Sequence, residues 1–171
     1  ALDSTIPETS IIIEYLDRHY PGAIQLLPTE LSDALCVRLW DRFFDLYVQE
    51  PMQAIVADVR RADKDRSAQS VAEAQSLLRT AYEMIEKQLD GKTWITGENV
   101  TMADCAAAPA LFYAETLVPF GEEHGRLKAY YQRLLDRPSF ARVLQEAMPY
   151  FRYYPYREKL PAQFRPEKPN A

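Results

Sequence analysis

The segment from Trp94 to Pro109, WITGENVTMADCAAAP, constrains the fold of this chain more than any other stretch. Thr101 and Asp104 have the spacing of a capping box, in which each side chain accepts a hydrogen bond from the other residue's backbone N–H. Val100 and Cys105 flank the box at the two positions of a hydrophobic staple. Small apolar residues follow at once. We therefore expect a helix that starts at Thr101 and whose first turn is buried, because N–H groups away from water need such partners.

Apolar residues recur at helical spacing through most of the remaining chain. Pro51 should kink or split one helix, and Pro109 should bend the helix that starts at Thr101, because proline has no backbone N–H to donate. The chain has only five glycines, fewer than the turns of a sheet-rich fold normally need. The sequence therefore predicts an all-α fold of about six or seven helices. The expected helical ranges are 9–20, 29–63, 70–89, 101–117, 126–136 and 138–148.

Apolar positions that recur at helical spacing mark one face of each expected helix. In the first two helices they are Ile12, Ile13 and Leu16, then Leu35, Leu39, Phe43, Leu46 and Tyr47. The clearest stripe is Val71, Ala74, Leu78, Ala81, Ile85 and Leu89. The last two helices offer Leu127, Tyr130, Tyr131, Leu134 and Leu135, then Phe140, Val143, Leu144 and Ala147.

Charge and cysteine usage exclude several classes of partner. The net charge of −5 argues against duplex nucleic acid and against an anionic membrane surface. The basic residues in 60–66 alternate with aspartates, which is typical of a solvated turn. No apolar run approaches the ~20 residues that cross a bilayer. Cys36 and Cys105 lie in helical patterns, and no CxxC or HxxxH spacing occurs, so we expect no disulfide, no metal site and a cytoplasmic location.

Two motifs together resemble the glutathione transferase family. Gly97-Glu-Asn-Val-Thr101-Met-Ala-Asp104 is similar to the Gly-x-x-x-Ser/Thr-x-Ala-Asp stretch that opens the core helix of the family's helical C-terminal domain. Glu8-Thr9-Ser10, followed by Ile11 to Asp17, is similar to the Glu/Gln-Ser/Thr pair and helix that close its N-terminal thioredoxin-like domain. The resemblance runs from about Ala1 to Met148 and covers both motifs in the family's order.

The resemblance implies a domain organisation. Residues 1–21 would be a remnant of the thioredoxin-like, glutathione-binding domain, with an edge strand and its last helix. Residues 22–28 would be a linker, and 29–148 the C-terminal helical domain. Residues 149–171, rich in aromatic residues and proline, should form an extended tail that aromatic packing orders in part.

Glu8 and Thr9 are the first candidates for a binding site. A helix N-terminus binds carboxylates, and Thr9 is expected as the N-cap, where its hydroxyl would be a further donor. Glu8 could meet an ammonium, so the pair suits the γ-glutamyl end of glutathione, the co-substrate that the resemblance implies. The alternative is that Thr9 only caps the helix and Glu8 only favours its dipole. Pro7 lies too close to this pair to match the family's Val-Pro, which holds the cysteinyl part of glutathione.

The resemblance also implies a pocket for the electrophile. Phe43, Tyr47, Tyr113 and Tyr153 are the candidates to line it, since tyrosine combines an apolar ring with a polar group. The alternative for each is packing in the core or at a dimer interface. Thr101 and Asp104 are assigned to the cap and not to catalysis, because no base lies near them in sequence.

These residues lead to one favoured function and two alternatives. The intact parent would be a homodimeric glutathione transferase that joins the glutathione thiolate to a small hydrophobic electrophile. The family's thiol-activating Tyr, Ser or Cys has no counterpart here, so we assign no catalytic residue and expect this chain alone to be inactive. One alternative is a non-catalytic module of the same fold, used for assembly or regulation. The other is an unrelated helical bundle that binds partners through its aromatic tail.

Overall fold

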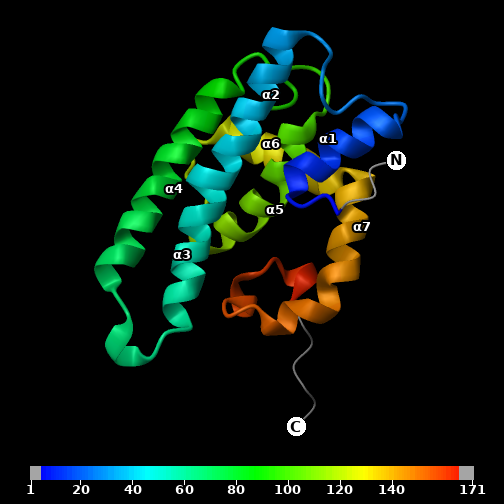
Figure 1. Ribbon diagram of the computed structural model, residues 1–171. Coiled ribbons are helices and arrows are strands. Elements are labelled where there is room, and N and C mark those ends of the chain that lie inside the picture. The colour runs from blue at the N-terminus through cyan, green and yellow to red at the C-terminus, as the bar shows by residue number, and fades with distance from the viewer. Residues whose placement is uncertain (1–4, 166–171) are drawn as a thin grey trace.

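The computed structural model describes residues 5–165, and within them the chain is all-α, as predicted. This part of the chain has seven α-helices and no β-strand; their arrangement can be followed in Figure 1. Their bounds are α1 Thr9–His19, α2 Leu31–Phe43, α3 Glu50–Val59, α4 Ala68–Gln88, α5 Met102–Leu117, α6 Gly125–Asp136 and α7 Pro138–Ala147. None of the helices in this range combines the length and the apolar character that crossing a bilayer requires.

Helix α5 is the centre of the fold. It packs against α2, α3 and α6, while α3 and α4 lie side by side at the edge of the molecule (Figure 1). Most of its side chains are buried, and many are alanines, which let the neighbouring helices approach closely. The predicted capping box at its start is confirmed: the Asp104 carboxylate accepts the N–H of Thr101 at 2.7 Å.

Pro51 is preceded by a π-helical turn that joins two α-helices. Residues Phe44–Gln49 form a π-helix (η1), which joins α2 to α3. Since Pro51 has no N–H, the preceding carbonyls lack one helical donor, and the wider π-turn fits this break. The turn lies beside the candidate site described below.

Of the apolar residues that recur at helical spacing along α2 and η1, Phe43 is buried and the other four are not. Leu35, Leu39, Leu46 and Tyr47 are exposed, with Leu35 at 56% and Leu39 at 65%. The core face instead consists of Ala34, Val37, Trp40, Phe43, Phe44 and Val48. Two apolar stripes run along this helix, and spacing alone does not say which one faces inward.

Helix α1 is peripheral. Ile13 packs against the core, whereas Ile12 and Leu16, which share its helical face, are exposed. Polar contacts hold this helix: the Asp17 carboxylate accepts the N–H groups of Leu26 and Leu27, each at 3.0 Å. By contrast, the predicted stripe of α4 is buried apart from Val71, which is partly buried.

Aromatic packing orders the tail, as expected, but 3-10 helices fold it back onto the bundle instead of leaving it extended. They are Met148–Tyr153 (η3), Arg157–Lys159 (η4) and Ala162–Phe164 (η5). Phe151 and Leu160 are buried in a second small core with Phe112 and Leu144. Single turns have no apolar period, so periodicity cannot predict them. Most of the expected edge strand, and the end of the tail, lie outside the described residues.

Candidate functional site

A cleft of about 290 Å³ opens between the N-terminus of α1 and the bundle, and Glu8 and Thr9 line one of its walls. Glu8, not Thr9 as predicted, is the N-cap, and Thr9 is the first residue of the helix. The Glu8 side chain makes no capping hydrogen bond. The first N–H groups of α1, with their partial positive charge, are therefore left for another acceptor.

The backbone of Glu8 is strained. Its φ of 70° and ψ of 124° place it in a region that residues with a Cβ rarely adopt. Such a conformation costs about 1–3 kcal/mol and persists where the surrounding structure enforces it, often at binding sites. The strain aims the start of α1 at the cleft.

The facing wall comes from α2 and the π-helix and is acidic. The Ser10 hydroxyl donates a 2.7 Å hydrogen bond to Asp41, whose side chain is only 3% exposed. Burial raises the pKa of the Asp41 carboxyl, and the bond from Ser10 opposes this only in part. Asp45, one turn further, pairs with Arg42 at 2.9 Å. The hydrogen bond between Ser10 and Asp41 ties the first turn of α1 to α2.

Sequence reasoning missed Ser10 and Asp41. A signal was present, because Asp41 lies between two aromatic residues, Trp40 and Phe43, in a helical stretch. A carboxylate within a buried face requires a partner or a function. Only the folded chain shows that the partner comes from α1, which lies 31 residues earlier in the chain.

The third wall is the first half of α5, where Cys105, Ala106 and Pro109 reach the cleft. Their small side chains leave room between α5 and α1. Although Cys105 reaches the surface, burial by the surrounding protein raises the pKa of its thiol, and the nearby Asp104 carboxylate adds to this. A thiol kept protonated in this way is a poor nucleophile, so Cys105 is a wall residue.

The four aromatic residues predicted for the acceptor pocket are not brought together. Phe43 is buried in the core, with its ring 5.2 Å from that of the exposed Tyr47. Tyr113 lies one turn beyond Pro109 on α5, away from that pair in sequence. Tyr153 is 65% exposed and packs only on the guanidinium of Arg152, at 4.7 Å.

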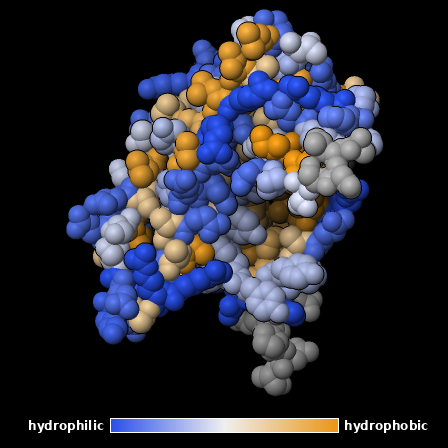
Figure 2. Space-filling view, viewed as in Figure 1, coloured by the Kyte–Doolittle hydropathy of each residue, from blue (hydrophilic) through white to orange (hydrophobic). Residues whose placement is uncertain are grey.

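Tyr154, which the sequence did not single out, contacts Tyr113 instead. Their ring centroids are 5.0 Å apart, and the Tyr154 hydroxyl lies 2.8 Å from the hydroxyl of Thr116. Burial raises the pKa of Tyr154 to about 12, partly offset by the bond with Thr116. In Figure 2, apolar surface lies at the bottom of a hollow below α1, with the C-terminal tail at its lower edge.

A helical bundle whose central helix opens with a buried capping box, with a cleft at the head of a preceding helix, defines a class of protein. It is the helical domain of glutathione transferases. The model of the glutathione S-transferase C-terminal domain matches residues 41–138, and the chain belongs to this family.

Similar proteins agree with this assignment. The chain is 31% identical over 135 residues to glutathione S-transferase-like protein LUC7 of a Fusarium species, covering 77% of this chain and 61% of that protein. It is 25% identical over 131 residues to elongation factor 1-gamma-A of Xenopus laevis, covering 75% of this chain and 30% of that protein. The chain thus spans less than two thirds of either relative.

Solved structures show the same fold. A glutathione S-transferase from Methylobacterium radiotolerans, in complex with glutathione sulfonate, matches with a TM-score of 0.68 and 25% identity, over 80% of this chain and 65% of that one. A glutathione S-transferase from Methylobacillus flagellatus with GSH bound matches with a TM-score of 0.72 and 22% identity, over 80% and 68%.

Proposed function

We propose that this chain is the helical part of a glutathione transferase that joins the glutathione thiolate to small hydrophobic electrophiles. The observation that carries the proposal is the strained Glu8, which directs the uncapped N-terminus of α1 into a cleft. The γ-glutamyl carboxylate would bind the hydroxyl and N–H of Thr9, since both donors lie at the positive end of a helix. The ammonium on the same carbon would meet the Glu8 carboxylate.

This geometry favours binding over simple capping. A residue that only caps a helix has a relaxed backbone and a side chain bonded to the first turn. Glu8 has neither feature. The acidic facing wall, with Asp41 and Asp45, adds negative potential beside the expected ammonium.

The acceptor part of the proposal now rests chiefly on Tyr113. It lies on α5 beyond the cleft and is only partly covered by Tyr154. Burial raises the pKa of the Tyr113 phenol, so it stays protonated and can donate a hydrogen bond to an electrophile. The positions of Phe43 and Tyr153 favour the alternatives, core packing and an exposed surface respectively.

The thiol-activating group would come from outside residues 1–171. We expect this chain alone to show no conjugation of a nitroaryl halide with glutathione, and measurable turnover by it would contradict this. Both cysteines of the described residues are free thiols, which fits the reducing cytoplasm where glutathione is also kept reduced.

The test is glutathione binding to the intact parent, measured by isothermal titration calorimetry. Thr9→Val keeps the shape of the side chain but removes the hydroxyl. A lost hydrogen bond to a charged group costs about 1.5–3 kcal/mol, so we expect the Kd to rise at least about tenfold. Thr9→Ser keeps the hydroxyl and should bind within about threefold of the wild type. Equal affinities of the Val and Ser variants would overturn the proposed site.

The second candidate is a non-catalytic module for assembly or regulation. The likeness to elongation factor 1-gamma-A favours it, because that relative is not named as a transferase. The intact parent would then fail to bind a glutathione-affinity resin. The third possibility, an unrelated helical bundle, is contradicted by the family match.

A further inference from the structure

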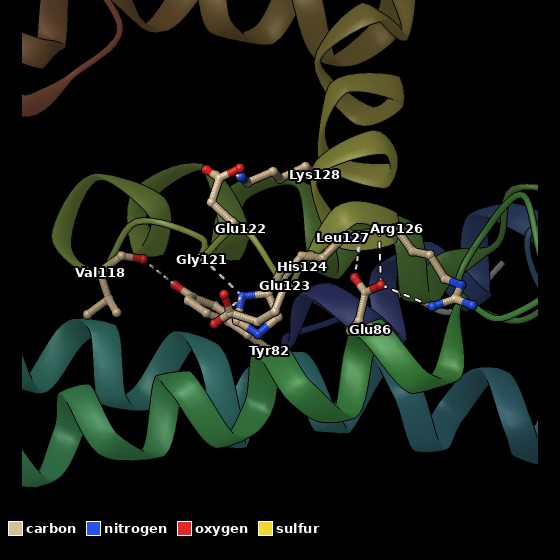
Figure 3. Close-up of polar contacts among 10 residues, drawn as sticks. All are labelled: Tyr82, Glu86, Val118, Gly121, Glu122, Glu123, His124, Arg126, Leu127 and Lys128. Carbon is tan, nitrogen blue, oxygen red and sulfur yellow. Dashed lines mark hydrogen bonds and ion pairs between the residues drawn. The ribbon is translucent and has the colours of Figure 1, made fainter.

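A buried histidine lies in the turn between α5 and α6, far along the chain from the cleft residues. His124 is the residue that precedes α6 and is only 5% exposed. Its ring packs edge-to-face on Tyr82 of α4, with the centroids 5.9 Å apart (Figure 3). The proposed transferase function makes no use of it.

The hydrogen bonds of His124 define which ring nitrogen carries the proton. Nδ1 accepts the N–H of Gly121 at 3.1 Å, so the neutral ring must carry its proton on Nε2. Nε2 is buried and has no hydrogen-bond partner among the described residues. In the neutral ring, Nδ1 therefore accepts a hydrogen bond, whereas the Nε2–H group donates none to the described residues.

A second partner for Nδ1 is already in place. The Glu123 carboxylate lies 3.8 Å from it and folds against Gly121, where a Cβ would collide with the carboxylate oxygens. Figure 3 shows the three side by side in one turn. Once protonated, Nδ1 must donate and can no longer accept the Gly121 N–H. Among residues 5–165, the charged acceptor within 4 Å of Nδ1 is then the Glu123 carboxylate.

The turn is tied at both ends by contacts that do not involve the His124 ring. The Tyr82 hydroxyl donates to the carbonyl of Val118 at 3.1 Å. The Glu86 carboxylate of α4 accepts the N–H groups of Arg126 and Leu127 at 3.1 and 2.8 Å, which holds the start of α6. Movement caused by His124 is therefore confined to residues 118–124.

The other titratable groups around His124 lie on α4, on α5, in the turn and on α6. On α4, Tyr82 has its pKa raised by burial, whereas Glu86 has its pKa lowered because its hydrogen bonds outweigh burial. In the turn, the bond from Lys128 of α6 lowers the pKa of Glu122. Glu115 of α5 has its pKa raised by burial. The remaining groups of α6 are Arg126, held by Glu86 and Asp90, and Tyr131, whose pKa is raised by burial.

We propose that His124 is a proton-operated latch of the α5–α6 turn. In neutral form it closes the turn through the Gly121 N–H. Protonation removes this bond, leaves a charged Nε2–H buried without an acceptor, and turns Nδ1 towards Glu123. The turn should therefore open reversibly on acidification, while the bundle stays folded.

Amide hydrogen exchange of the whole chain tests the latch, with rates corrected for intrinsic pH dependence. In the wild type, the protection of the Gly121 amide should fall by up to about tenfold per pH unit, the limit for uptake of one proton. Core amides such as Leu78 and Ile85 should not change. His124→Asn keeps an acceptor and a good helix cap but does not titrate, so its Gly121 protection should be flat. Flat protection in the wild type, or an equal slope in His124→Asn, would overturn the latch.

Two variants and one spectroscopic measurement separate the role of His124 from the roles of the neighbouring titratable groups. Glu123→Gln removes the charged acceptor of the protonated ring, so it should reduce the loss of protection, and Glu115→Gln should leave the loss unchanged. A slope that disappears in Glu115→Gln would overturn the assignment to His124, and no effect of Glu123→Gln would overturn the Glu123 step. Long-range ¹H–¹⁵N spectra of the wild type should show the Nε2–H tautomer at about pH 7.5. The Nδ1–H tautomer would contradict the closed state.

Discussion

The hydroxyl of Tyr130 lies 2.7 Å from Oδ1 of Asp104, and this contact ties α6 to the first turn of α5. The same carboxylate accepts the N–H of Ile95 and both the N–H and the hydroxyl of Thr101. One buried side chain therefore joins the loop before α5, the helix cap and α6. The capping box is a junction of three segments.

The first prediction concerns this junction. Asp104→Ala leaves several buried donors without a partner, so we expect a loss of about 4 kcal/mol in the free energy of unfolding. Tyr130→Phe removes only one bond and should cost about 1 kcal/mol. Urea unfolding of the two variants and the double mutant gives the coupling. Glutathione turnover per folded molecule of the parent should be unchanged in Asp104→Ala, and a specific loss of turnover would contradict a purely structural role.

The fold could be predicted because its main determinants are local. The capping box at Thr101 and Asp104, the single stripe of α4 and the proline and glycine boundaries each follow from short-range rules. The orientation of α2 could not be predicted, because it carries two apolar stripes, one of which faces solvent. The 3-10 turns of the tail could not be predicted either, since they depend on Phe151 and Leu160 packing against distant helices.

The second prediction concerns the strained backbone at Glu8. Glu8→Gly should stabilise the chain by about 1 kcal/mol, because glycine adopts a positive φ without strain but has a larger unfolded-state entropy. Glu8→Ala is the matched control, since it also removes the carboxylate but keeps the Cβ and the strain. Thermal unfolding compares the two. Equal stability would show that the backbone at this position carries no strain.

The third prediction is a pH dependence caused by Asp41. Its pKa is raised by burial, so the folded state binds this proton more tightly than the unfolded state does. The free energy of unfolding should therefore fall as the pH rises from about 4, the unfolded value, through the higher folded value, and then level off. Asp41→Asn keeps an acceptor for Ser10 and lacks this loss. Urea unfolding from about pH 4 to 7 should show its advantage growing with pH; a constant difference would refute the assignment.

The fourth prediction concerns the contact between the tail and α5. Tyr154→Phe removes the bond to Thr116 and should cost about 1 kcal/mol near pH 8. Because the pKa of Tyr154 is raised to about 12, its contribution is complete below about pH 10 and is lost as the pH rises towards 12. Ultraviolet difference absorbance should show one fewer tyrosine that ionises late in the variant. An unchanged titration curve would contradict the buried hydrogen bond.

The fifth prediction is the proposed homodimer. Leu31, Leu35 and Leu39 form an exposed stripe along α2, and apolar surface follows this helix in Figure 2. Such a stripe is typical of an interaction surface. Replacing Leu35 and Leu39 together by Glu should shift the sedimentation velocity profile from dimer to monomer. Tyr150→Glu, in the tail, is the control and should remain dimeric; a wild-type chain that sediments as a monomer would count against the proposal.

The candidate site was only half accessible from the sequence. Glu8 and Thr9 could be named because their motif and their place at a helix start are local features. Asp41 and Tyr154 could not, since each matters through one partner far away in the chain, Ser10 and Tyr113 respectively. Pairings of this kind are set by how the helices cross and not by the spacing of residues within one of them.

The central position of α5 has a consequence for how this cleft can change. Its alanine-rich surface is enclosed on nearly every side, so a larger side chain there would push neighbouring helices apart. The peripheral helix α1 is held mainly by polar contacts of Ser10 and Asp17, and the C-terminal turns pack through the separate small core around Phe112. Residue changes in these outer segments can therefore alter which molecule binds, while α5, which forms one wall of the cleft, stays the same.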